Sequence, residues 1–132
     1  MRFLLDTHCF LWAGFKPEKL SRQASEVICN PENDVFVSVV TFWEVALKYA
    51  LGKIELTGIE PDELHSLAEE MGFDILTMGP EEAVSFYRLP RLPHKDPFDR
   101  MIIWQAIRHK MILISKDRSF KEYQKYGLKL QC

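Results

Sequence analysis

Two aspartates stand one helical turn apart in the segment HKDPFDRMIIWQA, residues 94–106. Asp96 precedes Pro97, and Asp99 lies three residues further on, where a long apolar stretch begins. Carboxylate oxygens bind hard divalent cations, and such an ion promotes hydrolysis by activating a bound water. The pair is therefore a candidate for part of a metal site that acids from elsewhere in the chain would complete.

The acids also have a structural explanation, because carboxylates cap helices. Asp96 is a good N-cap residue with proline behind it, and Asp99 then lies at the favourable end of the helix dipole. Thr41-x-x-Glu44 matches a capping box, in which Glu44 reaches back to the amide of Thr41. Asp117 can cap the segment RSFKEYQKY. Capping explains acids at helix starts, so their position in the fold must decide between the two explanations.

The hydrophobic periodicity of the sequence predicts strands alternating with helices, and these elements position the acids. We expect strands at residues 2–5, 35–40, 73–77 and 111–115, with a short edge strand at 128–131. We expect helices at residues 7–14, 20–29, 41–51, 61–71, 80–89 and 97–109, with a last one from 117 to about 126. This alternation predicts right-handed crossovers and a mainly parallel sheet covered on both faces. The prediction is an α/β fold in a single domain spanning residues 1–132.

Ligands of such sheets bind beyond the carboxyl ends of the strands. All the candidate acids pass this test, since each stands at a strand end or at a helix start near one: Asp6, Glu44, Asp96, Asp99 and Asp117. Asp6 directly closes a buried apolar strand, where a carboxylate is costly without a partner. Five carboxylates near one edge repel each other strongly unless a positive charge lies among them.

The donor types narrow the choice of metal. Oxygen ligands with no histidine or cysteine at ligand spacing favour Mg²⁺ or Mn²⁺ over Zn²⁺. The four histidines show no HxxxH or HxH spacing, so no zinc site is expected. The three cysteines form no CxxC pair and no disulfide framework, which predicts a reducing, cytoplasmic location. No apolar run approaches the length of a membrane span, so no membrane insertion is expected.

The charge is unevenly distributed along the chain, although the formal net charge is only −2. Residues 1–87 hold 6 basic and 15 acidic side chains, a balance of −9, whereas residues 88–132 hold 11 basic and 4 acidic, a balance of +7. Such asymmetry creates a basic surface for an acidic partner if these side chains share a face. Ordinary solvated helix faces explain it equally well.

The acidic positions, in order along the chain, resemble those of the PIN-domain family, and within it the VapC-type toxins of bacterial toxin–antitoxin pairs. LLDTH carries the first aspartate, SVVTFWEVALK a polar residue and the glutamate, HKDPFDRMIIWQA the third acid and ISKDRSF the fourth. The resemblance covers the whole chain, and none of the four positions departs from it. It implies a compact three-layer α/β/α sandwich that cleaves RNA with Mg²⁺ or Mn²⁺, is inhibited by a small cognate antitoxin, and forms a homodimer.

The resemblance assigns a role to individual residues. Four acids are expected to be catalytic and to hold the metal: Asp6, Glu44, Asp99 and Asp117. Thr7 and Ser38 are expected to support the carboxylates or to orient water. Independently of the resemblance, the basic balance of residues 88–132 makes Arg100, Lys116 and Arg118 candidates for phosphate contacts. For Arg100, an ion pair with one of the two neighbouring aspartates, Asp96 or Asp99, is the alternative.

Two other functions fit an α/β protein with clustered acids. A phosphorylated receiver domain needs an acceptor aspartate at the end of its third strand, but FDILTMG offers none there, because Asp74 lies inside the strand pattern. A non-catalytic binding protein would use the same acidic edge for partner recognition. Loss of one acid would favour that alternative, and none is lost.

Overall fold

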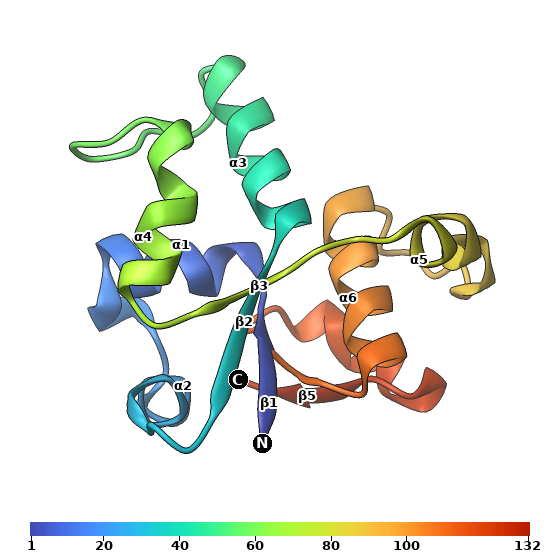
Figure 1. Cartoon of the computed structure of the whole chain (residues 1–132). Coiled ribbons are helices and arrows are strands. Elements are labelled where there is room, and N and C mark those ends of the chain that lie inside the picture. The colour runs from blue at the N-terminus through green and yellow to red at the C-terminus, as the bar shows by residue number, and fades with distance from the viewer.

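The computed structural model describes all 132 residues, Met1–Cys132, and contains one five-stranded sheet (Figure 1). All neighbouring strands pair in parallel, in the order β3-β2-β1-β4-β5. The strands are β1 (Arg2–Leu5), β2 (Asp34–Ser38), β3 (Asp74–Leu76), β4 (Ile112–Ile114) and β5 (Lys129–Gln131). The α-helices are α1 (Thr7–Phe15), α2 (Arg22–Cys29), α3 (Val39–Ala50), α4 (Leu64–Glu70), α5 (Pro80–Ser85) and α6 (Pro97–His109). The predicted α/β fold with a parallel sheet is confirmed.

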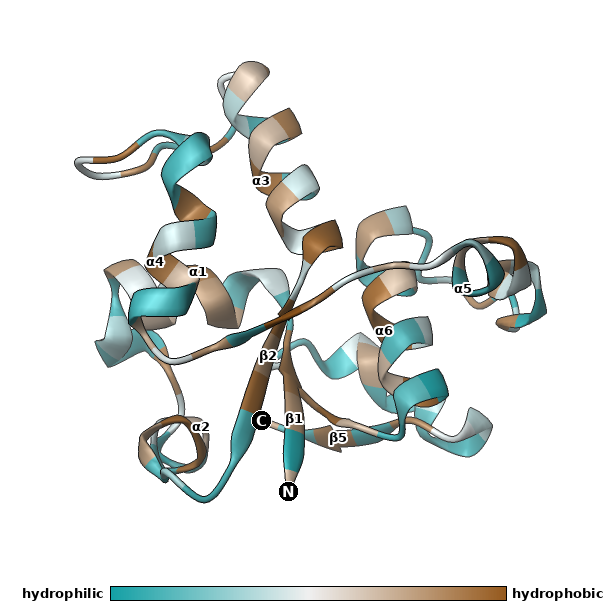
Figure 2. Cartoon of the chain, in the orientation of Figure 1, coloured by the Kyte–Doolittle hydropathy of each residue, from teal (hydrophilic) through white to brown (hydrophobic).

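Helices cover both faces of the sheet. Successive side chains of each strand point to opposite faces, so each strand packs against helices on both sides. In β1, Phe3 and Leu5 pack with residues of α1, α2 and α4, whereas Leu4 packs with Ile102 and Ile103 of α6. Figure 1 shows these two groups of helices on either side of the central strands. In Figure 2 the central strands are mostly hydrophobic, with hydrophilic residues at their amino ends. The carboxyl ends of the central strands are therefore buried, and polar side chains there need hydrogen-bond or ionic partners.

The boundary between β2 and α3 differs from the prediction. The strand ends at Ser38, and α3 begins at Val39, two residues earlier than expected. Ser38 is the N-cap, because its hydroxyl accepts a hydrogen bond from the amide of Val40 at 3.0 Å. The predicted capping box of Thr41 and Glu44 is therefore wrong. Both residues lie within the helix, where their side chains are free to point at the sheet edge.

The last helical segment, Arg118–Tyr126, is a 3₁₀-helix and not an α-helix. Asp117 caps it as predicted, accepting from the amide of Ser119 at 2.9 Å. A 3₁₀-helix repeats every three residues, so Phe120 and Tyr123 fall on one face, and both are buried against the sheet. The segment ends at Gly127, whose φ of 102° is readily adopted by glycine.

The other predicted helices are present; α2, α4 and α5 are shorter than predicted, whereas α1 extends one residue further, to Phe15. Short 3₁₀ turns precede α2 and α4, at Pro17–Lys19 and Pro61–Glu63, and a third follows α5, at Phe86–Arg88. The helix α6 matches its predicted bounds, because Pro97 and the cap Asp96 mark its start unambiguously. None of the helices combines the length and the apolar character that crossing a membrane requires.

The strand order also bears on the receiver-domain alternative. Receiver domains of the flavodoxin-like type have the order 2-1-3-4-5, whereas here β1 lies between β2 and β4 and β3 is at the edge. Asp74 is the first residue of the edge strand β3 and is exposed, so it does not stand at the carboxyl end of the third strand. The receiver-domain alternative is therefore wrong.

Candidate functional site

Asp6 stands at the carboxyl end of the central strand and is 4% exposed. Its backbone amide donates to the carbonyl of Ile114, which extends the pairing of β1 with β4 by one residue. Its side chain caps α1, since Oδ1 accepts from the amide of Cys9 at 2.8 Å. Burial raises the pKa of Asp6 above its ordinary value, and hydrogen bonds from Ser115 and Cys9 oppose that rise only in part. The carboxylate is thus placed where negative charge is costly.

Glu44 points from the second turn of α3 into the same edge and is buried. Thr7 donates from Oγ1 to Glu44 Oε1 at 2.6 Å, and Lys48 donates from Nζ to Oε2 at 2.5 Å. Thr7 Oγ1 also lies 3.2 Å from Thr41 Oγ1. Burial lowers the pKa of Lys48, but its hydrogen bond and ion pair with Glu44 outweigh this and raise it. Thr7 therefore holds a carboxylate, as predicted, whereas Lys48 was missed by the sequence analysis.

Asp96 and Asp99 occupy the start of α6 with different surroundings. Asp96 is the N-cap, because its Oδ1 accepts from the amides of Phe98 at 2.9 Å and Asp99 at 3.1 Å. Carboxylate oxygens of Glu44, Asp96 and Asp99 all lie within 4.8 Å of one another. Burial, followed by the charges of Asp96 and Glu44, raises the pKa of Asp99 to about 6. Asp99 therefore lies where the negative charges of its neighbours are concentrated.

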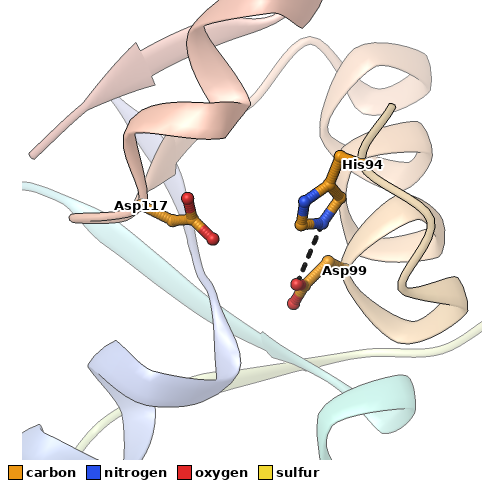
Figure 3. Close-up of side chains that lie close together, drawn as sticks. All are labelled: His94, Asp99 and Asp117. Carbon is orange, nitrogen blue, oxygen red and sulfur yellow. Dashed lines mark hydrogen bonds and ion pairs between the residues drawn. The ribbon is translucent and has the colours of Figure 1, made fainter. Parts of the chain in front are cut away.

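A second group shares Asp99 and includes a histidine (Figure 3). Ligand atoms of His94, Asp99 and Asp117 lie within 4.8 Å of one another, and His94 Nε2 is 3.1 Å from Asp99 Oδ2. Figure 3 shows Asp117 facing the other two from the segment that follows β4. Burial alone raises the pKa of Asp117, but hydrogen bonds from Ser119 outweigh it and hold that pKa below its usual value. His94 was missed because no second histidine stands at ligand spacing from it.

The predicted acids are thus brought together around Asp99. Glu44 and Asp117 belong to the two groups that share Asp99. Asp6 belongs to neither group, yet it is near enough for its charge to raise the pKa of Asp99 further. Mutual repulsion among carboxylates at this density is relieved by a divalent cation, and hard oxygen donors are the ligands that Mg²⁺ and Mn²⁺ take. The donor set fits such an ion.

Ser38 and Gln105 form a polar link beside the site. The buried Ser38 hydroxyl donates to Gln105 Oε1 at 2.5 Å, and Gln105 Nε2 donates to Glu82 Oε2 at 2.9 Å. Ser38 therefore fixes the start of α3, the helix that carries Glu44, and contacts no acid of the site directly. The link joins β2, α6 and α5. Neither Gln105 nor Glu82 was predicted from the sequence, since the two residues are 23 positions apart and no local pattern pairs them.

Arg100 is positioned differently from the prediction. Its guanidinium is buried, 8% exposed, and donates to the carbonyls of Pro90 and Leu89 at 3.2 Å each. It also lies 5.3 Å from the centre of the Phe86 ring. The expected ion pair with an aspartate is wrong, and the group that was to contact phosphates instead anchors the loop before α6. Lys116 and Arg118 fit that role better, since with Lys121 they line a cavity of about 380 Å³ that includes Asp117.

The raised pKa of Asp99 predicts how pH changes the effect of a metal. In the metal-free protein, a folded-state pKa of about 6 against an ordinary 3.8 means that stability is greatest below the ordinary value and falls as pH rises through 6. A divalent cation competes with that proton, so it binds more tightly at about pH 7 than at about pH 5. Melting curves with EDTA and with Mg²⁺ at both pH values measure this. The prediction is contradicted if Mg²⁺ raises the melting temperature equally at the two pH values. It is also contradicted if the effect of Mg²⁺ on the melting temperature depends on pH to the same extent in Asp99→Asn as in the unaltered protein.

Comparisons with known proteins agree with this geometry. The model of the PIN domain family matches residues 3–126. Over 123 residues the chain is 31% identical to Ribonuclease VapC22 of Mycobacterium tuberculosis (strain ATCC 25618 / H37Rv), covering 92% of this chain and 91% of that relative.

Solved structures share the fold at lower identity. VapBC2 from Rickettsia felis, bound to a DNA fragment from its promoter, has a TM-score of 0.69 at 16% identity, covering 99% of this chain and 98% of that chain. VapBC-1 from nontypeable Haemophilus influenzae has a TM-score of 0.66 at 19% identity, covering 99% and 97%. Together with the family match over nearly the whole length, the parallel sheet and the acids at its carboxyl edge lead to one conclusion: the chain belongs to the PIN-domain family.

Proposed function

We propose that the protein is a metal-dependent endoribonuclease and the toxin of a toxin–antitoxin pair. The observation that carries the proposal is the convergence of acids on Asp99 at the carboxyl edge of the sheet, with Glu44 and Asp117 in the two groups that share it. Membership of the PIN-domain family and the likeness to a relative named as a ribonuclease support the same reaction, the hydrolysis of RNA phosphodiester bonds.

Each acid has a part in the proposed mechanism. Four carboxylates would hold Mg²⁺ or Mn²⁺, directly or through water: Asp6, Glu44, Asp99 and Asp117. The ion, when bound, lowers the pKa of a coordinated water and offsets charge on the phosphate. Thr7 and Lys48 each hold one oxygen of Glu44, which keeps that carboxylate in a single orientation. The buried Asp6 adds negative charge from the floor of the site, which draws the cation toward the sheet edge.

The RNA backbone would approach from the basic side of Asp117. Lys116, Arg118 and Lys121 line the cavity next to that acid, and such side chains bind phosphates of any sequence. They bring a phosphodiester within reach of the carboxylates without selecting a base. The excess of basic residues in the last third of the chain agrees with this path.

The proposed protein partners are a small cognate antitoxin and a second copy of the chain. Trp43 and Leu47 in α3 and Leu51 at its C-cap are spaced four residues apart, so they fall on one side of the helix, and Trp43 is 62% and Leu51 60% exposed. Figure 2 shows hydrophobic residues recurring along this helix. An exposed apolar stripe of this kind is typical of protein interfaces. We also propose a cytoplasmic location, supported by three cysteines that are all free.

Two alanine variants at the start of α6 test the proposed function. Asp96→Ala removes the helix cap and is expected to cost about 1 kcal/mol of unfolding free energy while RNA cleavage persists. Asp99→Ala is expected to abolish Mg²⁺- or Mn²⁺-dependent cleavage with the fold intact, because it removes the carboxylate that both groups share. Thermal melting and RNA cleavage, measured on both variants, check this.

Three results would contradict these assignments. If Asp96→Ala abolishes cleavage in a folded protein while Asp99→Ala cleaves normally, the two roles are reversed. If the unaltered protein cleaves no RNA with either ion, or cleaves equally well after exhaustive treatment with EDTA, the metal-dependent reaction is excluded. If the unaltered protein cleaves no RNA under any of these conditions, the alternative of a non-catalytic binding protein is favoured.

A further inference from the structure

We propose that His94 is a metal ligand of this chain, binding through Nε2 beside the carboxylates of Asp99 and Asp117, and that it makes the site prefer Mn²⁺ to Mg²⁺. The inference rests on the proposal that the acidic cluster holds a divalent ion. It adds a nitrogen donor to a site described so far by oxygen donors alone. His94 lies in the loop before α6, outside every helix and strand.

The position of the ring favours a ligand role. His94 Nε2 is 3.1 Å from Asp99 Oδ2, and Asp117 offers an oxygen within 4.8 Å of both. Figure 3 shows the imidazole and the two carboxylates converging on a common space from the loop, from α6 and from the segment after β4. Three donors at such separations can bind one ion with little movement of the side chains.

The ring is fixed by its neighbours in the orientation that a ligand requires. Ser119 donates from Oγ to Asp117 Oδ1 at 2.7 Å, which leaves an Oγ lone pair for the hydrogen on His94 Nδ1, 3.1 Å away. With Nδ1 as donor, the lone pair of the neutral ring is on Nε2, the atom that faces the acids. The edge-to-face contacts with Phe120 and Tyr123, at centroid distances of 5.4 and 6.5 Å, hold the plane of the ring.

This arrangement is the usual one for a metal-binding histidine, whose second nitrogen is hydrogen-bonded to a fixed acceptor. Here the acceptor is itself bound to Asp117, so one hydrogen-bonded chain orients two ligands together. A histidine serving only to neutralise Asp99 has no need of such a chain. The packing against Phe120 also keeps Nε2 from turning away toward solvent.

The metal preference follows from the type of donor. The group of Glu44, Asp96 and Asp99 offers only oxygen, which suits Mg²⁺ and Mn²⁺ alike. The group that contains His94 offers a nitrogen, and imidazole binds Mn²⁺ more readily than Mg²⁺, which favours oxygen and retains its waters. Replacement of His94 should therefore affect the two ions unequally.

The direct test is electron spin-echo spectroscopy of Mn²⁺ bound to the purified full-length chain. Coordinated imidazole gives a ¹⁴N modulation, which we expect in the unaltered protein and expect to be lost in His94→Gln. Calorimetric titration should show Mn²⁺ affinity falling by about 10- to 100-fold in that variant, with a smaller loss for Mg²⁺. His65→Gln is the matched control, because His65 is also paired with an acid, Glu69 at 3.6 Å, but on the exposed face of α4. It should change neither affinity nor spectrum.

Several outcomes would overturn the proposal. Bound Mn²⁺ without ¹⁴N modulation in the unaltered protein excludes His94 as a ligand, and this measurement needs no variant to fold. Equal losses of Mn²⁺ and Mg²⁺ affinity in a folded His94→Gln protein assign the histidine to positioning of Asp99 alone. No RNA enters these measurements, so a failure of the ribonuclease proposal is seen separately, as metal binding without cleavage.

Discussion

Asp6→Asn reduces metal-dependent RNA cleavage at least about 100-fold and raises the melting temperature of the metal-free protein. The loss of activity is expected because a bound ion supplies several kcal/mol of transition-state stabilisation, and each 1.36 kcal/mol is a factor of ten in rate. Asparagine has nearly the same shape and keeps an oxygen for the Cys9 amide, so the cap of α1 survives. Only the negative charge is removed.

The rise in stability follows from the direction of the pKa shift. Burial raises the pKa of Asp6, so its ionised form at neutral pH costs folding free energy that is absent below the ordinary value. Asparagine removes this cost. Melting curves in EDTA at neutral pH measure the effect, and Asp74→Asn is the control, since Asp74 is exposed on the edge strand β3 and belongs to neither acidic group. A lower melting temperature for Asp6→Asn would identify Asp6 as a structural residue.

Glu82→Ala lowers the free energy of unfolding by about 3 kcal/mol, although Glu82 lies outside the acidic site. Glu82 is buried and accepts from Gln105 Nε2 at 2.9 Å, and its Oε1 is 2.8 Å from His109 Nε2. Arg108 adds an ion pair at 4.0 Å. Alanine leaves the buried amide of Gln105 without this acceptor and opens a cavity between α5 and α6.

Urea unfolding of Glu82→Ala and of Glu81→Ala measures the effect. Glu81 is the exposed neighbour on the same helix, so its replacement should change stability by less than about 0.5 kcal/mol. Similar small losses in both variants would show that the link from Glu82 through Gln105 to Ser38 contributes little to the fold.

Local sequence patterns sufficed for the elements whose signals lie within a few residues. Asp96, Pro97 and the apolar periodicity that follows define the start of α6, and the structure has the cap and the bounds as predicted. The short apolar run before Asp6 likewise defines the central strand. In both cases the residues that cap or end the element are adjacent to it in sequence.

The hydrophobic pattern of the sequence could not place an element boundary where a strand and the following helix have the same residue types. Apart from Ser38, the run from Val35 to Val40 is apolar and mostly valine, so periodicity alone could not show that Ser38 ends the strand and caps α3. The 3₁₀ form of 118–126 was also missed, because the three-residue repeat of its aromatic side chains matters only once they pack against the sheet.

The long-range partners in the site were beyond local reasoning. Lys48 is four residues from Glu44, but that pair stands equally well on a solvated helix face. Ser38 and Gln105 are 67 residues apart, and the guanidinium of Arg100 binds carbonyls about ten residues away across a loop. Such contacts depend on the crossovers that bring α6 and β2 together, and no spacing in the sequence encodes them.

The outermost strands of the sheet, β3 and β5, have three residues each. Edge strands this short offer few free backbone donors and acceptors, so another chain gains little by adding a strand to either margin. This protects the protein from edge-to-edge aggregation and from continuous sheets across subunits. We therefore expect the proposed association of two copies to use side chains outside the sheet edges, so that point changes on an exposed helix face such as that of α3 should alter assembly without disturbing the sheet.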